Sequence, residues 1–113
     1  MAEKQLTQEQ SVDAISFEMI AHAGDARSYA FQALEAARNG DMEKADILME
    51  KSDEAGTLAH KVQTELLFKE MNGQSTPVNV LLVHAQDHLM SSMLAQELIK
   101  EMILMYKAGK ERE

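Results

Sequence analysis

The chain has 113 residues, of which 45% are hydrophobic and 27% charged, and this composition suits one globular domain over residues 1–113. Eleven basic residues against 19 acidic ones give a net charge of −8 without any basic stretch, so nucleic-acid binding and a basic membrane anchor are not expected. The lack of cysteine excludes disulfides and thiolate chemistry, and the lack of an apolar run near the roughly 18 residues of a membrane span predicts a cytoplasmic protein without membrane insertion.

The first predicted helix covers about residues 11–38. Small and apolar residues recur there at spacings of three and four, which indicates one face of an amphipathic helix. Gly24 lies inside this helix at a cost of about 1 kcal/mol relative to alanine, so we expect it to mark close packing. Asn39 and Gly40 have the chemistry of a helix C-terminus. The predicted face consists of Val12, Ile15, Met19, Ala23, Ala26, Ala30, Leu34 and Ala37.

The second predicted helix covers about residues 42–69, with Asp41 as its N-cap. The small size of many residues on its predicted face favours close approach between helices. That face consists of Ala45, Leu48, Ser52, Ala55, Ala59, Val62 and Leu66.

A loop-like stretch at residues 72–77 precedes the third helix, predicted over about residues 78–107. Thr76 and Pro77 suit the N-cap and the first helical position, and Ala108–Gly109 suits the end. Three long helices with short connections predict an all-α, up-down-up three-helix bundle. Such a bundle is thin, so self-association is expected as well.

The third helix has two apolar faces, and a three-helix bundle needs only one of them. At 100° per residue, Asp87 falls in the middle of the first face. The second apolar face therefore predicts a partner surface, with another copy of the chain as the simplest partner. The face around Asp87 consists of Val80, Val83, Met90, Leu94, Leu98, Met102 and Met105; the opposite face consists of Leu82, Ala85, Leu89, Met93, Ile99 and Ile103.

His84, Asp87, His88 and Ser91 form a polar island on this apolar helix. Burying a charge costs free energy unless the charge is paired or binds a cation. Ionisable residues on an apolar helix therefore indicate a specific role. The residues alone leave three functions open: phosphoryl carriage on a nucleophilic imidazole, metal binding by His and Asp, or a helical adaptor in which the island sets the oligomer register. A hydrogen-bonded core network is the purely structural interpretation. The other two histidines, His22 and His60, are interpreted as packed or surface residues.

The segment VHAQDHLMSSMLAQELI, from Val83 to Ile99, resembles the signature of the lactose/cellobiose-type enzyme IIA components of the bacterial phosphoenolpyruvate-dependent sugar phosphotransferase system (PTS). Two further segments resemble the same family: AHAGDARSYAFQAL, from Ala21 to Leu34, and RNGDMEKAD, from Arg38 to Asp46. The similarity covers about residues 12–107. Ser91 stands where the family often has threonine. The signature string is closer to the cellobiose/chitobiose branch than to the lactose branch.

The resemblance implies a phosphohistidine carrier. In this family the phosphorylated carrier protein HPr gives its phosphoryl group to Nε2 of the histidine that matches His84. The group then passes to a cysteine of the IIB component, while the membrane component IIC takes up the sugar. The resemblance also implies a homotrimer, a nine-helix bundle in which three copies of Asp87 hold one divalent cation, usually Mg²⁺. Gln86 and His88 are candidates to orient His84 or its phosphate, either within one subunit or across a subunit boundary. The alternatives are a metal-binding helical bundle and a non-enzymatic oligomeric adaptor.

Overall fold

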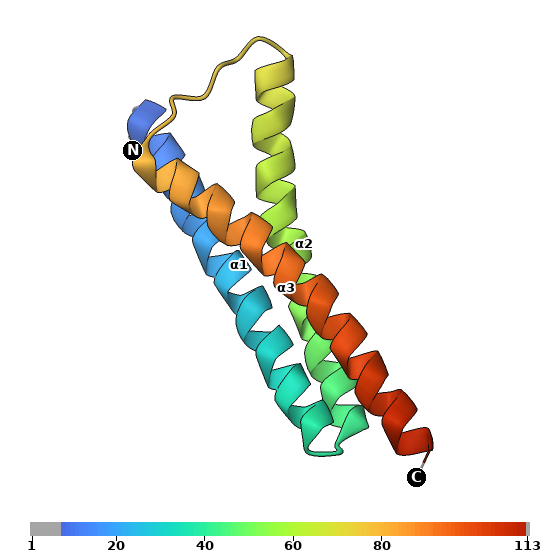
Figure 1. Ribbon diagram of the computed structural model, residues 1–113. Coiled ribbons are helices and arrows are strands. Elements are labelled where there is room, and N and C mark those ends of the chain that lie inside the picture. Colours follow the sequence, from blue (N-terminus) through green and yellow to red (C-terminus); the bar gives the residue numbers. More distant parts are fainter. Residues whose placement is uncertain (1–7, 113) are drawn as a thin grey trace.

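Three long helices arranged up-down-up make up the computed structural model, which describes residues 8–112 (Figure 1). Helix α1 spans Gln8–Arg38, α2 spans Met42–Met71 and α3 spans Val80–Glu111. No strand occurs in this part of the chain. The predicted all-α, up-down-up bundle is confirmed. The predicted domain also includes residues 1–7 and 113, which lie outside the described residues.

The turn between α1 and α2 follows the predicted capping chemistry. Gly40 has a φ of +84°, a left-handed conformation that glycine adopts without the steric cost of a Cβ. Its N–H donates to Ala37 O at 3.0 Å and the N–H of Asp41 donates to Ala36 O at 2.9 Å, which is the Schellman pattern. The Asp41 carboxylate accepts from the N–H of Lys44 at 3.1 Å and so caps α2.

The core lies around α1, which packs against both α2 and α3. Its buried face is rich in alanine, so the helix backbones approach closely. The predicted face of α2 is buried throughout, while on α1 Ile15 and Leu34 are only half-buried and the rest of the predicted face is buried. Ser16, Ala33 and Ala36 are also buried, because α1 has two neighbours and therefore needs a wider buried face than the periodic pattern predicted.

A polar layer crosses the middle of the bundle. Ser52 Oγ on α2 donates to Ala26 O on α1 at 2.6 Å, and Gln96 Nε2 on α3 donates to Ser52 O and Oγ, both at 3.0 Å. Gly56 leaves room for this amide, since a Cβ at that position would lie 2.9 Å from it. The prediction that Gly24 marks close packing is wrong, because a Cβ there would meet nothing within 4 Å.

The predicted N-cap of the third helix is wrong by three residues, and the helix begins at Val80 instead of about residue 78. Asn79, not Thr76, is the N-cap, and its side-chain oxygen accepts from the N–H of Leu82 at 2.9 Å. The Asn79 side-chain amide also donates to Asp13 Oδ1 on α1 at 3.0 Å. This contact joins residues 66 positions apart, so no local pattern could reveal it. The connection between α2 and α3 therefore extends to Asn79 instead of Pro77.

The predicted end of the third helix is also wrong, because α3 continues through Gly109 to Glu111. Contacts with the rest of the bundle support this last part. Lys107 Nζ lies 2.7 Å from Asp46 Oδ1, and Lys110 Nζ donates to Gly40 O at 2.9 Å. None of the helices described here is both long and apolar enough to cross a membrane.

Candidate functional site

Helix α3 presents one apolar face to the bundle and another to solvent, as its two-faced pattern predicted. Leu89 is 1% exposed and its neighbour Met90 is 58% exposed. We call the solvent-facing set the α3 stripe, and it holds Asp87 in its middle. The stripe consists of Val80, Val83, Met90, Leu94, Leu98, Met102 and Met105.

Asp87 is exposed in the single chain, and so is His84. The interpretation of the polar island as a hydrogen-bonded core network is therefore wrong for the single chain. A carboxylate exposed to water carries no desolvation penalty, but burying it unpaired under a partner that covers the α3 stripe would cost free energy. Any partner that buries the stripe must accordingly supply a cation or a polar group at this position.

The two histidines of the island lie one helical turn apart with their rings in contact. Their ring centroids are 5.0 Å apart and the ring planes meet at 75°, an edge-to-face arrangement. His84 is exposed and His88 is half-buried. Among residues 11–112, no side chain forms a hydrogen bond with a ring nitrogen of His84. The imidazole of His84 is thus supported on one side by a neighbouring ring while its nitrogens stay accessible.

Gln86 points away from this pair, towards α2. Its side-chain amide donates to Gln63 Oε1 at 3.3 Å. The structure therefore brings His88 to His84 and does not bring Gln86 to it within one chain. Gln63 is not among the predicted site residues, and no signal in the sequence distinguishes it from other polar residues on a helix surface.

Within the described residues no three His, Asp or Glu side chains gather as metal ligands would. Asp87 therefore cannot hold a cation by itself within one chain. Its carboxylate oxygens are nevertheless the donor type that hard cations such as Mg²⁺ prefer. This donor set fits such an ion only where several copies of Asp87 meet.

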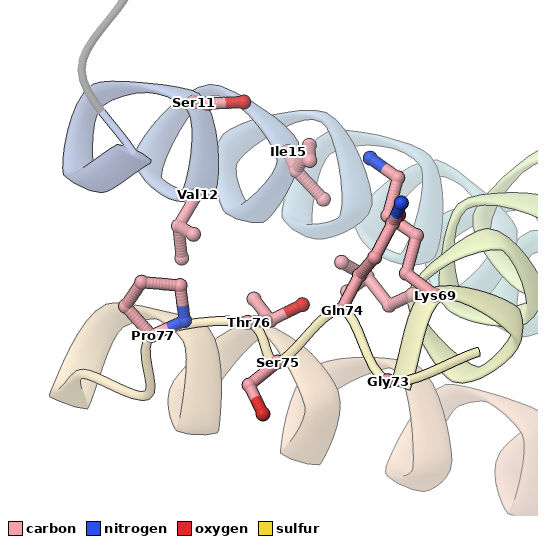
Figure 2. A pocket seen from close by; sticks show the side chains of 10 residues that line it. Ser11, Val12, Ile15, Lys69, Gly73, Gln74, Ser75, Thr76 and Pro77 are labelled. Atoms are coloured by element: carbon pink, nitrogen blue, oxygen red, sulfur yellow. The ribbon is translucent and has the colours of Figure 1, made fainter. Parts of the chain in front are cut away.

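A cavity of about 590 Å³ lies between the start of α1 and the α2–α3 connection (Figure 2). Lys69, Gln74 and Thr76 contribute polar groups to its lining, and Val12 and Ile15 contribute apolar ones. Its lining includes no histidine or carboxylate. The chemically distinctive residues of this chain therefore lie on the surface of α3 and not in this cavity.

Comparison with known proteins gives concordant matches. The profile of the family "PTS system, Lactose/Cellobiose specific IIA subunit" matches residues 14–107. The lactose-specific EIIA component of the PTS from Staphylococcus epidermidis is 42% identical over 98 residues, covering 87% of this chain and 94% of the relative. The crystal structure of the cellobiose-specific enzyme IIA from Bacillus anthracis is 43% identical, with a TM-score of 0.86 and 97% of both chains covered.

A further similar structure comes from the IIA(Chitobiose)–HPr complex of the Escherichia coli phosphotransferase system. It is 38% identical, with a TM-score of 0.76, and covers 96% of this chain and 99% of the other. Fold and similarity together define a component of a phosphotransferase system. Within that class, the chain belongs to the lactose/cellobiose-specific IIA subunit family. The resemblance carried by the Val83–Ile99 segment is confirmed.

Proposed function

We propose that this IIA component carries a phosphoryl group on Nε2 of His84, taking it from phospho-HPr and passing it to a cysteine of the IIB component of its transport system. The observation that carries the proposal is the accessible imidazole of His84 on the solvent side of α3, within the segment that matches the family. HPr is supported as donor because a similar IIA structure was determined in complex with it. A cytoplasmic location follows from the proposed donor.

Phosphoryl transfer requires the protein mainly to position the imidazole of His84 and to leave it accessible to partner proteins. The lone pair of Nε2 attacks the phosphorus, an N–P bond forms and the bond from phosphorus to the donor breaks, its electron pair leaving with the donor. In the second step a thiolate of IIB attacks the same phosphorus and the N–P bond breaks, returning the lone pair to Nε2. Both steps need a partner protein within reach of the ring, which the exposure of His84 supports.

His88 is proposed as a positioning residue. Its ring packs against the ring of His84 at a centroid separation of 5.0 Å, which limits the orientations that the acceptor ring adopts. Gln86 is held by Gln63 of α2 and faces away from the His84 of its own chain. Its proposed role is therefore confined to a His84 of a neighbouring subunit.

The proposed working form is a homotrimer in which the α3 stripes of three copies meet. Three Asp87 carboxylates would then face one another and repel strongly. A single Mg²⁺ ion with carboxylate-oxygen ligands would remove that repulsion, so Asp87 is the residue proposed to hold it. The apolar stripe supports this arrangement, because it is exposed in the single chain and needs a cover.

We propose a β-linked disaccharide of the cellobiose/chitobiose class as the transported sugar, with recognition by the membrane component IIC. Support comes from the TM-score of 0.86 to a cellobiose-specific IIA. Lactose-specific relatives are as similar in sequence, at 42% identity, so the sugar needs its own experiment. Transfer from the phosphorylated chain to purified IIB components of each branch identifies the one with the fastest transfer.

Mass spectrometry of the protein after incubation with phospho-HPr tests the central proposal. We expect one acid-labile phosphoryl group, and fragmentation should locate it on His84. The alternatives predict other outcomes: a metal-dependent enzyme acquires no phosphohistidine, and an adaptor acquires no phosphate. A phosphate found on His22, His60 or His88 would contradict the assignment of His84.

A further inference from the structure

His84 and His88 form a pair of imidazoles one turn apart on the same face of α3. Two histidines at positions i and i+4 of a helix are the arrangement by which proteins clamp a transition metal between two ring nitrogens. We propose that this pair is a two-histidine clamp for Zn²⁺ and similar borderline cations. The clamp is separate from the proposed Mg²⁺ position at Asp87, because it uses nitrogen donors from a single chain.

The separation of the two rings fits such a clamp. With a Zn–N bond of about 2.0–2.1 Å and roughly 1.1 Å from the nitrogen to the ring centre, each ring centroid lies about 3.2 Å from the metal. Two centroids 5.0 Å apart then subtend about 100° at the metal, close to the tetrahedral angle. Only rotation about side-chain bonds is needed to aim both nitrogens at one point. His84 is exposed, and no hydrogen bond from a described side chain to its ring nitrogens has to break for this rotation.

The ligand set also predicts which cations bind and how strongly. Neutral imidazole nitrogen suits Zn²⁺, Ni²⁺ and Cu²⁺, whereas Mg²⁺ prefers oxygen ligands. No third His, Asp or Glu joins the pair within the described residues, so water fills the remaining positions. We therefore expect reversible binding weaker than that of a four-ligand structural zinc site. The net charge of −8 favours cation approach.

A clamp at this place has a consequence that rests on the proposed function. We take Nε2 of His84 as the metal-ligating nitrogen, and a coordinated Nε2 has no lone pair left to attack phosphorus. Conversely, a phosphoryl group on Nε2 of His84 removes one of the two ligands. Metal binding and phosphoryl carriage are then mutually exclusive, and a rise in free zinc would hold the carrier in an unphosphorylated state.

Isothermal titration calorimetry tests the clamp without any phosphoryl transfer. The full chain, in excess Mg²⁺, is titrated with zinc sulfate. The excess Mg²⁺ saturates oxygen-ligand positions. We expect about one zinc ion per chain, and His88→Gln should weaken its binding roughly tenfold or more. His60→Gln is the matched control, because His60 is exposed on α2 and the residues one turn away, Gly56 and Thr64, are not histidines. This control should bind zinc within about twofold of the wild type.

His22→Gln is a second control. His22 Nε2 lies 3.8 Å from Glu18 Oε1, so this pair is an alternative site at which zinc could bind. Loss of zinc binding in His22→Gln with retention in His88→Gln would overturn the clamp, as would an unsaturable isotherm for the wild type.

Repeating the zinc titration on protein phosphorylated by phospho-HPr tests whether metal binding and phosphorylation exclude each other, and the zinc affinity should fall as far as in His88→Gln. Failure of phosphorylation itself would refute the proposed function, whereas the clamp would still stand or fall on the zinc isotherm of the unmodified chain.

Discussion

At the scale of single residues, His84 combines two properties that a phosphoryl carrier needs. It is exposed to partner proteins, and its ring is supported by His88 without hydrogen bonds from described side chains to its own nitrogens. A ring nitrogen whose lone pair accepts such a bond would be less available as a nucleophile. The Leu82, Ala85 and Leu89 side chains on the opposite face of α3 are buried and fix the helix that carries the ring.

Replacing His84 with alanine should abolish phosphoryl acceptance and leave the fold intact. An exposed side chain contributes little to packing, so the free energy of unfolding should change by less than about 0.5 kcal/mol. Acceptance is measured as acid-labile label transferred from phospho-HPr, and stability by urea unfolding. His60→Ala is the control and should accept at the wild-type rate. A His84→Ala protein that still takes up label would contradict the assignment.

The sequence predicted His84, Asp87 and His88 because they belong to one local pattern on one helix. Their angular positions follow from the helical repeat, and the two-faced pattern predicted that one apolar face would be left outside the bundle. The hydrogen bond between Gln86 and Gln63 was not predictable, since the two residues are 23 positions apart on different helices. Spacing along α3 does not say which of its polar residues turns towards α2.

At the scale of elements, periodicity located the helices and local capping chemistry located only some of their ends. The α1–α2 turn was predictable because Gly40 and Asp41 bond to residues within five positions. The start and end of α3 were mispredicted because Asn79 and Lys110 bond to Asp13 and Gly40, far away in the sequence. Tertiary contacts therefore overrode the Thr76–Pro77 and Ala108–Gly109 signals.

Substituting Asn79 with alanine should lower the free energy of unfolding by about 1 kcal/mol or more, since it removes the N-cap of α3 together with the bond to Asp13. The matched control is Thr76→Ala, at the position that the sequence favoured as the cap. That control should change stability by less than about 0.5 kcal/mol. Urea unfolding of both variants gives the comparison. Equal losses would mean that Thr76 shares the capping role.

Two mid-helix glycines should respond differently to alanine. Gly24→Ala places a Cβ in open space, so the variant should gain up to about 1 kcal/mol from alanine's higher helix propensity. Gly56→Ala places a Cβ 2.9 Å from the Gln96 amide, which must move and give up its bonds to Ser52. That loss of about 1 kcal/mol per bond should cancel or reverse the gain. A lower melting temperature for Gly24→Ala than for Gly56→Ala would contradict the polar layer as a packing constraint.

At the scale of the whole molecule, many large apolar side chains are exposed to solvent in the single chain. Alanine fills much of the core, while all three phenylalanines are at least half exposed: Phe17 at 62%, Phe31 at 50% and Phe68 at 57%. The bundle is also thin, with extents of 63 × 32 × 21 Å. A chain of this shape buries a small share of its apolar surface alone, which favours assembly with other chains.

Replacing Asp87 with leucine should keep the proposed trimer and make it independent of divalent cations. Three carboxylates at a shared axis need a cation, whereas three leucines extend the apolar stripe and need none. Sedimentation velocity with and without EDTA measures the effect: we expect the chelator to weaken the wild-type trimer and to leave Asp87→Leu unchanged. Asp87→Lys is the opposing control, because three uncompensated positive charges should drive dissociation. Asp87→Leu protein that sediments as a monomer would mean that the ion, and not the α3 stripe, holds the subunits together.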